Sequence, residues 1–382
     1  MIQWRQGTVR ELLPAWDGVL LMTVEVEDLG VVRALAYPDL VGTPEPGDRV
    51  LLNVTAQERG LGTGGYAVVV AVPDRPAAWP RRDHDHPGHL VKARYTPLQT
   101  MVLGVDDPEG EHHRVLAGAD DLGGMPVVAA DLHSSLPAVL AGVRQESADA
   151  RVAYVMTDGG ALPSAFSRTC AELRAAGWLQ CVVTAGQAYG GDLEAVTVHS
   201  ALLAAHLVAG ADVVVVAQGP GNLGTGTRWG FSGVSAGETL NAAAVLGGSP
   251  VASLRVSQAD PRPRHRGLSH HSATAYARVL AHPADVPLPL GQTGLPATDE
   301  CLAAVRSAVA ELVLVAPHLR PVDVPVDGLL DALADSPVRL STMGRDLEED
   351  AASFVAAAAA GRAAARMLGA GPGAPGSTPA SP

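Results

Sequence analysis

Hydrophobic and polar positions follow different patterns in two parts of the chain. Up to residue 75, short apolar runs such as "VVRALAYP" and "YAVVVAV" are separated by turn signals such as "TPEPGDRV". Runs of this kind, without helical patterns between them, predict a small all-β domain over residues 1–75, built as a barrel or a sandwich. Residues 76–125 predict a linker with connecting strands, because the stretch "PDRPAAWPRRDHDHPGH" is rich in proline and charge and has no periodicity.

From residue 126 onward, apolar runs of strand length alternate with helical patterns. "RVAYVMTDGG" precedes "AFSRTCAELRAAG", and "DVVVVAQGPG" leads to "SAGETLNAAAVLGG". Strand–loop–helix repeated in this way predicts an α/β domain over residues 126–368 with a mainly parallel, Rossmann-like, doubly wound sheet. The last residues, 369–382, read "GAGPGAPGSTPASP" and predict a disordered tail.

The composition agrees with a large buried core and limits the classes of partner. Hydrophobic residues make up 47% of the 382 residues and charged residues 18%, which argues against wholesale disorder. The formal net charge is -13, and an acidic chain repels phosphate backbones, so we expect no direct nucleic-acid binding. Lys92 is the only lysine, so a Schiff base at any other position is excluded.

The cysteines and the apolar runs indicate a cytoplasmic protein. Cys170, Cys181 and Cys301 form no CxxC pair, and we expect them to be core thiols. The opening residues "MIQWRQGTVRELL" lack the apolar core of a signal peptide, and no run reaches transmembrane length. A reduced cytoplasm without membrane contact is therefore expected.

Several segments together resemble a bacterial family of unknown function, DUF3866. They are "HPGHLVKARYTPLQ", "DLHSSLPAV", "MTDGGALPSAFSRT", "TAGQAYGGDLEAVT", "QGPGNLGTGTRWGFSG", "RHRGLSHHSATAYARVL" and "STMGRDLEEDAASFVAAAAAG". The resemblance spans most of the chain before the tail and implies that these segments belong together. It implies no reaction, no cofactor and no catalytic residue.

Polar residues follow the predicted strands of the α/β part, and ligands of open parallel sheets sit outside the carboxyl ends of the strands. We therefore expect a ligand site at this edge. The candidate catalytic residues are Asp131, His133 and Asp158, together with His270 and His271 of "LSHH". An Asp/His/Asp group can orient a general base or, with a histidine of "LSHH", bind a metal. No spacing enforces either role, and Asp131 or Asp158 can instead cap the helix that follows.

The stretch "GPGNLG" formally matches a dinucleotide-binding GxGxxG motif, but the context differs. Pro220 occupies the tight-turn position and more loop follows, where a helix should begin. A loop of small residues with exposed N–H groups, hydroxyls and an arginine suits phosphate or carboxylate. The alternative is a long turn in which glycines permit positive φ. The candidate anion-binding residues here are Gly219, Gly221, Asn222, Gly224, Thr225, Thr227 and Arg228.

A local basic cluster stands in "QADPRPRHRGLSHHS". Arg264 and Arg266 are candidates for an anion clamp, with a histidine as acid or base. The alternative is a solvated loop before a helix that Ser269 or Ser272 caps. Adjacent histidines on a helix point about 100° apart, so only one of the two in "LSHH" is expected to face a site.

The stretch "STMGRDLEEDAASFVAAAAAGRAAARML" predicts a loop and a long Ala-rich helix. Glu348, Glu349 and Asp350 suit the first turn of that helix. Its small-residue face can pack against the sheet or against a second subunit, and the sequence leaves both open.

Two classes of function follow from these patterns. The first is a cytoplasmic protein that binds a small anionic metabolite, phosphorylated ones included, at the sheet edge and uses Asp/His acid–base chemistry as an enzyme. The second is a non-catalytic regulatory or scaffold protein that binds a protein partner, with a homo-oligomer also open. The sequence identifies no cofactor and no particular metal.

Overall fold

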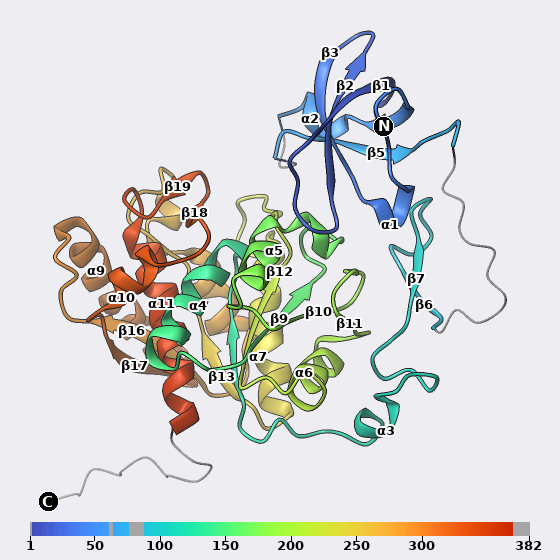
Figure 1. Ribbon diagram of the computed structural model, residues 1–382. Helices are drawn as coiled ribbons and strands as arrows, with labels where there is room; N and C mark the ends of the chain where they lie inside the picture. Colours follow the sequence, from blue (N-terminus) through green and yellow to red (C-terminus); the bar gives the residue numbers. More distant parts are fainter. Residues whose placement is uncertain (1, 61–63, 76–87, 370–382) are drawn as a thin grey trace, which may run out of the picture. The chain divides into compact units, whose positions relative to one another are not determined.

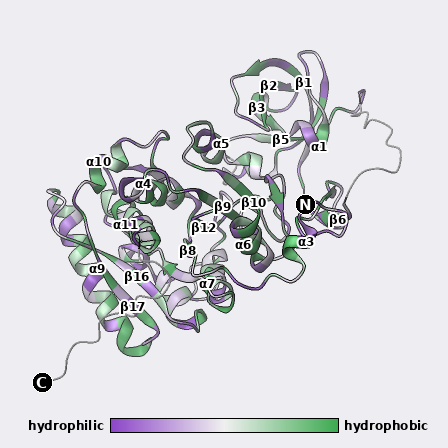
Figure 2. Cartoon of the chain, turned by 60° about the horizontal axis from the view of Figure 1, so that its bottom comes forward, coloured by the Kyte–Doolittle hydropathy of each residue, from purple (hydrophilic) through white to green (hydrophobic). Residues whose placement is uncertain are grey.

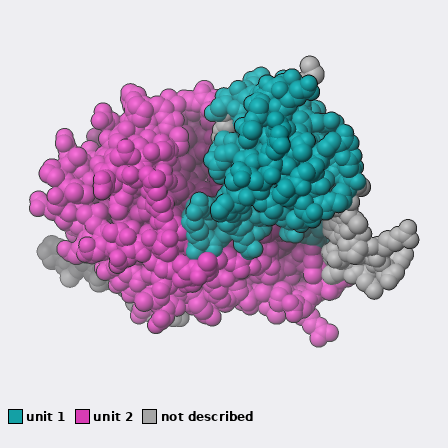
Figure 3. Space-filling view, turned by 45° about the horizontal axis from the view of Figure 1, so that its top comes forward, with its two compact units in different colours: residues 1–102, 165–172 teal, residues 103–164, 173–382 magenta. Residues whose placement is uncertain are grey.

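The computed structural model describes residues 2–60, 64–75 and 88–369. The chain divides into two compact units, shown in different colours in Figure 3. One comprises Met1–Val102 with Ala165–Glu172, and the other comprises Leu103–Ser164 with Leu173–Pro382. Most of the predicted linker stretch with His84 and His86, and residues 370–382 of the predicted tail, lie outside the described residues.

The first unit contains a closed five-stranded barrel, as the alternating pattern predicts. Its strands follow the order β1-β2-β3-β5-β4. Alternation explains the barrel core, because Met22, Val24 and Val26 of β2 are buried while Glu25 between them is exposed. The strand bounds are Trp4–Leu13 (β1), Leu20–Val26 (β2), Gly30–Ala36 (β3), Arg49–Asn53 (β4) and Ala67–Ala71 (β5). The short helices are Pro38–Val41 (α1) and Thr55–Glu58 (α2), and a hairpin joins Leu90–Lys92 (β6) to Thr100–Val102 (β7).

The second unit is built on an eight-stranded sheet in which every pair of neighbours is parallel. The strand order is β11-β10-β9-β12-β8-β13-β16-β17. All residues of the central strands β8, β9 and β12 are buried, which explains their continuous apolar runs. The bounds are Pro126–Ala129 (β8), Val152–Thr157 (β9), Cys181–Thr184 (β10), Leu193–Glu194 (β11), Val213–Gln218 (β12), Ser249–Ala252 (β13), Ala284–Leu290 (β16) and Leu319–Pro325 (β17).

Helices cover both faces of this sheet (Figure 1). The connection from β8 to β9 and the connection from β12 to β13 run in opposite directions along the sheet. Right-handed crossovers therefore place their helices on opposite faces. Leu136–Glu146 (α4) packs with Leu329–Ala334 (α10) and Ala351–Gly369 (α11), and Val198–Leu207 (α6) packs with Ser235–Val245 (α7). Pro296–Val315 (α9) contacts α11, while Arg168–Ala175 (α5) and His113–Leu116 (α3) are short.

The Ala-rich helix α11 packs inside the unit, which decides the alternative that the sequence left open for its small-residue face. A Cβ added to Gly142 of α4 would overlap the carbonyl group of Ala358, and one added to Gly361 of α11 would overlap that of Val139. The two helices thus approach backbone to backbone at reciprocal glycines. Figure 2 shows hydrophobic residues along β9, β10 and β12 and a mixture along α9. Within the described residues, no helix is long and apolar enough to cross a membrane.

The loops that follow the strands of the sheet contain short strands and single helical turns. Val256–Ser257 (β14) pairs with Gly267–Leu268 (β15), and Ser341–Thr342 (β18) pairs with Arg345–Asp346 (β19). Single turns of 3-10 helix occupy His133–Ser135 (η1), Ser164–Phe166 (η2), Ser232–Val234 (η3) and Pro263–His265 (η4). The helix His270–Thr274 (α8) continues into a π-helical turn, Ala275–Val279 (η5).

Candidate functional site

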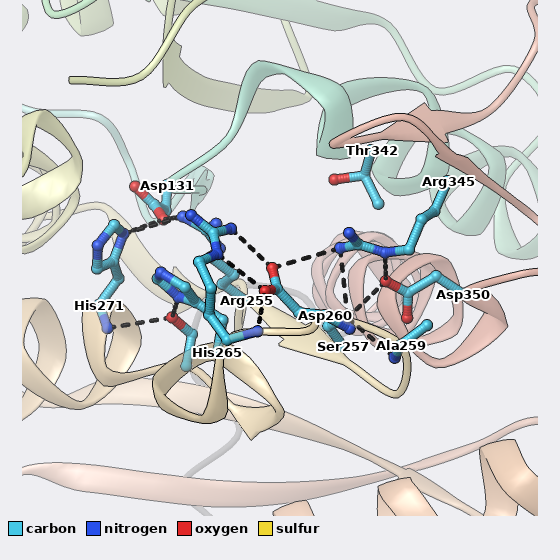
Figure 4. Close-up of polar contacts among 12 residues, drawn as sticks. Asp131, Arg255, Ser257, Ala259, Asp260, His265, His271, Thr342, Arg345 and Asp350 are labelled. Carbon is cyan, nitrogen blue, oxygen red and sulfur yellow. Dashed lines mark hydrogen bonds and ion pairs between the residues drawn. The ribbon is translucent and has the colours of Figure 1, made fainter. Parts of the chain in front are cut away.

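A cluster of charged side chains lies where the sheet changes its direction of winding. From β8 the chain proceeds to β9, toward one end of the sheet, and from β13 it proceeds to β16, toward the other. The neighbouring strands β8 and β13 therefore open a crevice at their carboxyl ends, the usual ligand position in such sheets. Asp131 follows β8 and Arg255 follows β13, and their side chains meet there (Figure 4).

Asp131 is the centre of this cluster and is only 4% exposed. Arg255 Nη1 donates to its Oδ2 at 2.8 Å, and His271 Nδ1 lies 2.8 Å from the same oxygen. The other oxygen, Oδ1, accepts from Asn222 Nδ2 at 3.1 Å. Burial alone would raise the pKa of Asp131, but the hydrogen bond with His271 and the charge of Arg255 hold it below its ordinary value. The carboxyl group is therefore a buried, charged and fully partnered anion.

The proton on His271 has two possible positions. With the proton on Nδ1, the ring donates to Asp131, and Nε2 carries the free lone pair. With the proton on Nε2, Nδ1 accepts from Arg255 Nη1, which lies 2.9 Å away. Phe231 stacks on this imidazole at a centroid distance of 3.7 Å and an interplanar angle of 10°. The ring is therefore fixed in place, and an adjacent carboxylate favours the Nδ1 tautomer.

Two more histidines, His265 and His270, lie next to His271. Ring centroids are 4.5 Å apart between His270 and His271, 4.8 Å between His265 and His271, and 5.0 Å between His265 and His270. The expectation that only one histidine of "LSHH" would face the site is wrong. Both stand at the first turn of α8, after the N-cap Ser269, where no preceding turn restricts the side chains. His265 comes from η4 and completes the group.

The environment keeps two of these histidines neutral. Burial lowers the pKa of His265 to about 3, and the charges of Arg255 and Arg262 act in the same direction. Burial, followed by the charges of His271 and Arg264, also lowers the pKa of His270. The Nε2 atom of His270 is buried and has no hydrogen-bond partner among the described residues. This buried ring nitrogen is therefore available for a ligand.

Gly233 gives Asp131 the room it needs. A Cβ at Gly233 would overlap Oδ1 of Asp131. This glycine begins the turn into α7 and is buried. The close approach explains a glycine here without any need for positive φ, and a side chain would displace the central carboxylate.

The predicted anion loop is exposed and makes its own hydrogen bonds. Thr225 Oγ1 and Thr227 Oγ1 lie 3.1 Å apart, and Gly230 N donates to Thr227 Oγ1 at 3.1 Å.

The glycines of this loop have different roles. The first, Gly219, packs against the carbonyl oxygen of Ala161, which would lie 2.5 Å from an added Cβ. Gly221 adopts a φ of 98°, so glycines serve both as turn residues and as close-packing residues. Gly224 forms an antiparallel bridge with Phe231, and Asn222 alone reaches the cluster through Asp131.

The structure separates the three arginines of "RPRHR". Arg262 Nε and Nη2 donate to the two carboxylate oxygens of Asp260 at 2.9 and 2.7 Å, so its charge is neutralised. Arg266 Nε donates to the carbonyl of Gln258 at 3.4 Å. The Arg264 guanidinium lies 3.5 Å from where a Cβ of Gly226 would stand, directly against the glycine loop. Neither Arg264 nor Arg228 has an acidic partner among the described residues.

Two of the predicted catalytic residues make other contacts. His133 Nδ1 lies 2.9 Å from Tyr154 Oη, and burial lowers its pKa to about 4. Asp158 is exposed, and its Oδ2 accepts from the backbone of Gln187 at 2.9 Å. Both residues follow strands at the same sheet edge as Asp131, but no hydrogen bond or ring contact described for these residues joins either of them to the histidine cluster.

Asp350 is a second buried charge, and its role differs from the one that the sequence predicts. Asp350 suits the first turn of α11 by position, yet its side chain is fully buried and faces the loop after β14. It accepts from Ser257 Oγ at 2.6 Å, from Gln258 N at 2.9 Å and from Arg345 Nε at 2.8 Å. Figure 4 shows this network beside the Asp131 cluster. Asp350 therefore fixes the segment that carries His265.

Arg255 is the residue that sequence reasoning missed. It stands in "VASLRVSQAD", three residues after β13, and is not among the candidates named from the sequence. The available signal was a charged residue immediately after a buried strand, at the same edge as the other candidates. Such a residue needs a buried partner, and Asp131 is the nearest in the topology.

Comparison with known proteins adds a family relationship but no activity. The family model described as a protein of unknown function (DUF3866) matches residues 33–361, from β3 of the barrel to within α11. No curated protein and no solved structure matches the chain.

Proposed function

The chain belongs to the DUF3866 family of proteins of unknown function, and from that premise we propose a function that rests on the side chains at the sheet edge. The protein binds a small anionic metabolite, such as a phosphorylated one, between the glycine loop and the histidine cluster. It acts on this ligand by acid–base chemistry through Asp131 and His271. The observation that carries the proposal is the position of Arg264, a guanidinium that lies against Gly226 of the glycine loop and has no acidic partner among the described residues.

The anion-binding part follows from unpaired positive charge in an acidic protein. Arg264 lies against the backbone of Gly226, and Arg228 stands two residues further along the same loop. Two guanidinium groups beside backbone N–H groups suit a phosphate or carboxylate, since arginine forms two parallel hydrogen bonds with either. Arg264 also acts electrostatically on His270, so a ligand held there would lie beside the titratable groups.

The acid–base part follows from the pair of Asp131 and His271. A buried carboxylate that accepts from Nδ1–H holds the imidazole in one tautomer and stabilises the imidazolium that forms when Nε2 takes a proton. The stacked Phe231 keeps the ring from rotating. We propose His271 Nε2 as the atom that accepts a proton from the ligand or from water and returns it in a later step.

The test begins with a thermal-shift screen of inorganic phosphate, sugar phosphates, nucleotides and carboxylates, and continues with calorimetric titration of each hit. Arg264→Ala and Arg228→Ala should each weaken binding by about 1.5–3 kcal/mol, roughly ten- to a hundredfold. Arg228→Lys should also bind more weakly than wild type, because an ammonium cannot reproduce the planar fork. Arg339→Ala is the control, since this exposed arginine lies outside the loop and the cluster.

Unchanged affinity in all these variants, with the fold intact, would mean that the loop is only a turn. Turnover of a hit should fall by about 10²–10⁴ in His271→Asn while the affinity changes little. Loss of affinity and turnover together in that variant would instead assign His271 to binding.

One observation favours the second class of function, a protein partner. Leu223 and Trp229 in the glycine loop are 73% and 56% exposed. Large exposed apolar residues mark interaction sites when they cluster on one loop. If a partner binds there, Leu223→Ser should abolish its binding and leave phosphate binding unchanged, which separates the two proposals.

We also propose a cytoplasmic location. Cys170 and Cys181 are buried, Cys301 is partly buried, and all three are free thiols. Burial raises the pKa of Cys181 to about 12 and that of Cys301 to about 11, so neither is a reactive thiolate at neutral pH. Free thiols persist in a reducing compartment. Fractionation of cells that express the protein tests this location.

A further inference from the structure

The three histidines of the cluster have the arrangement of a metal-binding site. One ring nitrogen from each of His265, His270 and His271 lies within 4.8 Å of the chosen nitrogens of the other two. Three imidazoles bound to one ion at about 2.0–2.1 Å have ring centres roughly 5 Å apart. The observed centroid separations of 4.5, 4.8 and 5.0 Å match that spacing. Packing of unrelated rings does not require all three separations to agree.

Hydrogen bonds to the outer nitrogens orient two of these rings. His271 Nδ1 faces Asp131 Oδ2 at 2.8 Å, and His265 Nδ1 faces Ser269 Oγ at 2.8 Å. With the proton on Nδ1 in both, each Nε2 lone pair is left for a ligand. A carboxylate or hydroxyl behind a histidine is the usual support of a metal ligand, because it fixes the tautomer and raises the basicity of the ring.

The third ring supplies an independent indication. His270 Nε2 is buried and has no hydrogen-bond partner among the described residues. Leaving a buried ring nitrogen unpaired is unfavourable, so a ligand that pairs with this atom would be stabilised. A metal ion in the centre of the cluster would satisfy this atom together with the two Nε2 atoms described above.

We infer that His265, His270 and His271 bind one divalent transition-metal ion of the Zn²⁺ class, with a fourth position open to a ligand. Imidazole ligands select such ions, whereas Mg²⁺ and Ca²⁺ prefer oxygen. Three protein ligands with an open position are typical of catalytic sites. The inference goes beyond the proposed function and changes one part of it: with an ion bound, the His271 Nε2 lone pair coordinates the ion and is not the proton acceptor.

The charges around the cluster are compatible with a bound cation, and they favour an anion as its fourth ligand. Arg255 lies 2.9 Å from His271, but its charge is balanced by Asp131 at 2.8 Å. The imidazoles are neutral as ligands, so a bound ion would keep its positive charge. Together with Arg264, this charge favours an anion in the open position.

The experiment uses the purified full chain, freed of metal with a chelator and then titrated with Zn²⁺ or Co²⁺ in a buffer without phosphate. We expect one equivalent to bind per chain, seen by calorimetry, with a Co²⁺ visible absorption band typical of low coordination number. His270→Gln is the primary variant because this side chain is only partly buried, whereas His265 and His271 are buried, so its replacement should disturb the fold least. It should lower affinity at least tenfold, as should His265→Gln and His271→Gln.

Two controls separate the cluster from other histidines. His199→Gln changes an exposed histidine of α6 and should bind like wild type. The double variant His84→Asn/His86→Asn removes the pair in "DHDHPGH" and should also keep the cobalt band. Asp131→Asn should weaken binding about 10–100-fold while leaving one site, because it weakens the support of His271 but removes none of the three histidine ligands.

The inference is overturned if the chain binds neither metal, or if the three cluster variants bind like wild type. It is also overturned if the cobalt band disappears in the "DHDHPGH" double variant. Circular dichroism of each variant verifies the fold, and the cobalt spectrum of the wild type gives a coordination signature that needs no variant. Because no anionic ligand is added, failure here leaves the anion titrations unaffected.

Discussion

The glycine loop Gly219–Gly230 and the segment Arg255–His271 lie at the same sheet edge, yet they differ in nearly every physical respect. The loop is mostly exposed beyond the buried Gly219, and its threonine hydroxyls bond to each other and to Gly230. The segment buries His265 and His271 and brings Arg255 to a carboxylate 124 residues away in the chain. The loop resembles a motif but is held by local contacts. The segment resembles no motif and is held by long-range buried charges.

The difference indicates which of the two regions contributes more to the free energy of unfolding. Local hydrogen bonds among exposed residues contribute little, because water competes for the same groups. A buried ion pair with several partners is costly to break from one side, since the remaining charge stays desolvated. The segment should therefore govern stability, whereas changes in the loop should be felt mainly in ligand binding.

The largest effect is expected when the central ion pair loses its cation. Arg255→Met leaves Asp131 buried without its counter-charge and should lower the free energy of unfolding by about 3–5 kcal/mol. Denaturant unfolding measures it, and Arg228→Met in the loop should stay within about 0.5 kcal/mol of wild type. The double variant Arg255→Met/Asp131→Asn should recover much of the loss. An effect below about 1 kcal/mol in the single variant would contradict the comparison.

A pair of glycine variants sharpens the comparison. Gly233→Ala places a Cβ on Asp131 and should destabilise the protein by about 1–3 kcal/mol through overpacking. Gly224→Ala in the loop meets nothing closer than 3.9 Å and should change stability by less than about 0.5 kcal/mol. Thermal unfolding of the two variants tests this. Equal effects would remove the distinction between buried and exposed glycines.

Acid should destabilise the protein through His133, at the carboxyl edge of the sheet. The pKa of His133 in the folded state is about 4, below its ordinary value of 6.5. The unfolded chain therefore binds the extra proton first, and stability falls as the pH drops from 6.5 toward 4. We expect a loss on the order of 1–2 kcal/mol from this residue. His133→Asn should flatten the profile over that range, and a profile identical to wild type would rule out this histidine.

The smallest effect is expected from the loop's own hydrogen bonds. Thr227→Val removes the acceptor of Gly230 N and the contact with Thr225, both exposed. The free energy of unfolding should fall by about 0.5–1 kcal/mol. Hydrogen exchange at Gly230 should speed up while exchange in β12 stays unchanged. A loss as large as that of Arg255→Met would mean that the loop carries the site's stability.

Periodicity was sufficient for the fold and for the edge at which the candidates lie. The barrel and the parallel α/β sheet follow from alternating and continuous apolar runs, which report burial directly. Periodicity could not identify the partner of Asp131, because two residues as far apart in the chain as Asp131 and Arg255 leave no local pattern. The joint orientation of His270 and His271 also escaped, since a helix start relaxes the angular rule that holds inside a helix. The packing of α11 on α4 depended on glycines whose partners are distant.

The reciprocal glycine contact between α4 and α11 has a consequence for synthesis on the ribosome. Helix α4 ends at Glu146, whereas α11 begins at Ala351, about 200 residues later. Contacts of such separation form late, because the loop between them must close first. During translation, the face of β8 and β16 that α11 covers stays bare until the last helix emerges. A nascent chain of this protein therefore exposes an aggregation-prone apolar surface for most of its elongation. Docking of α11, after this helix leaves the ribosome, is the step that covers this surface.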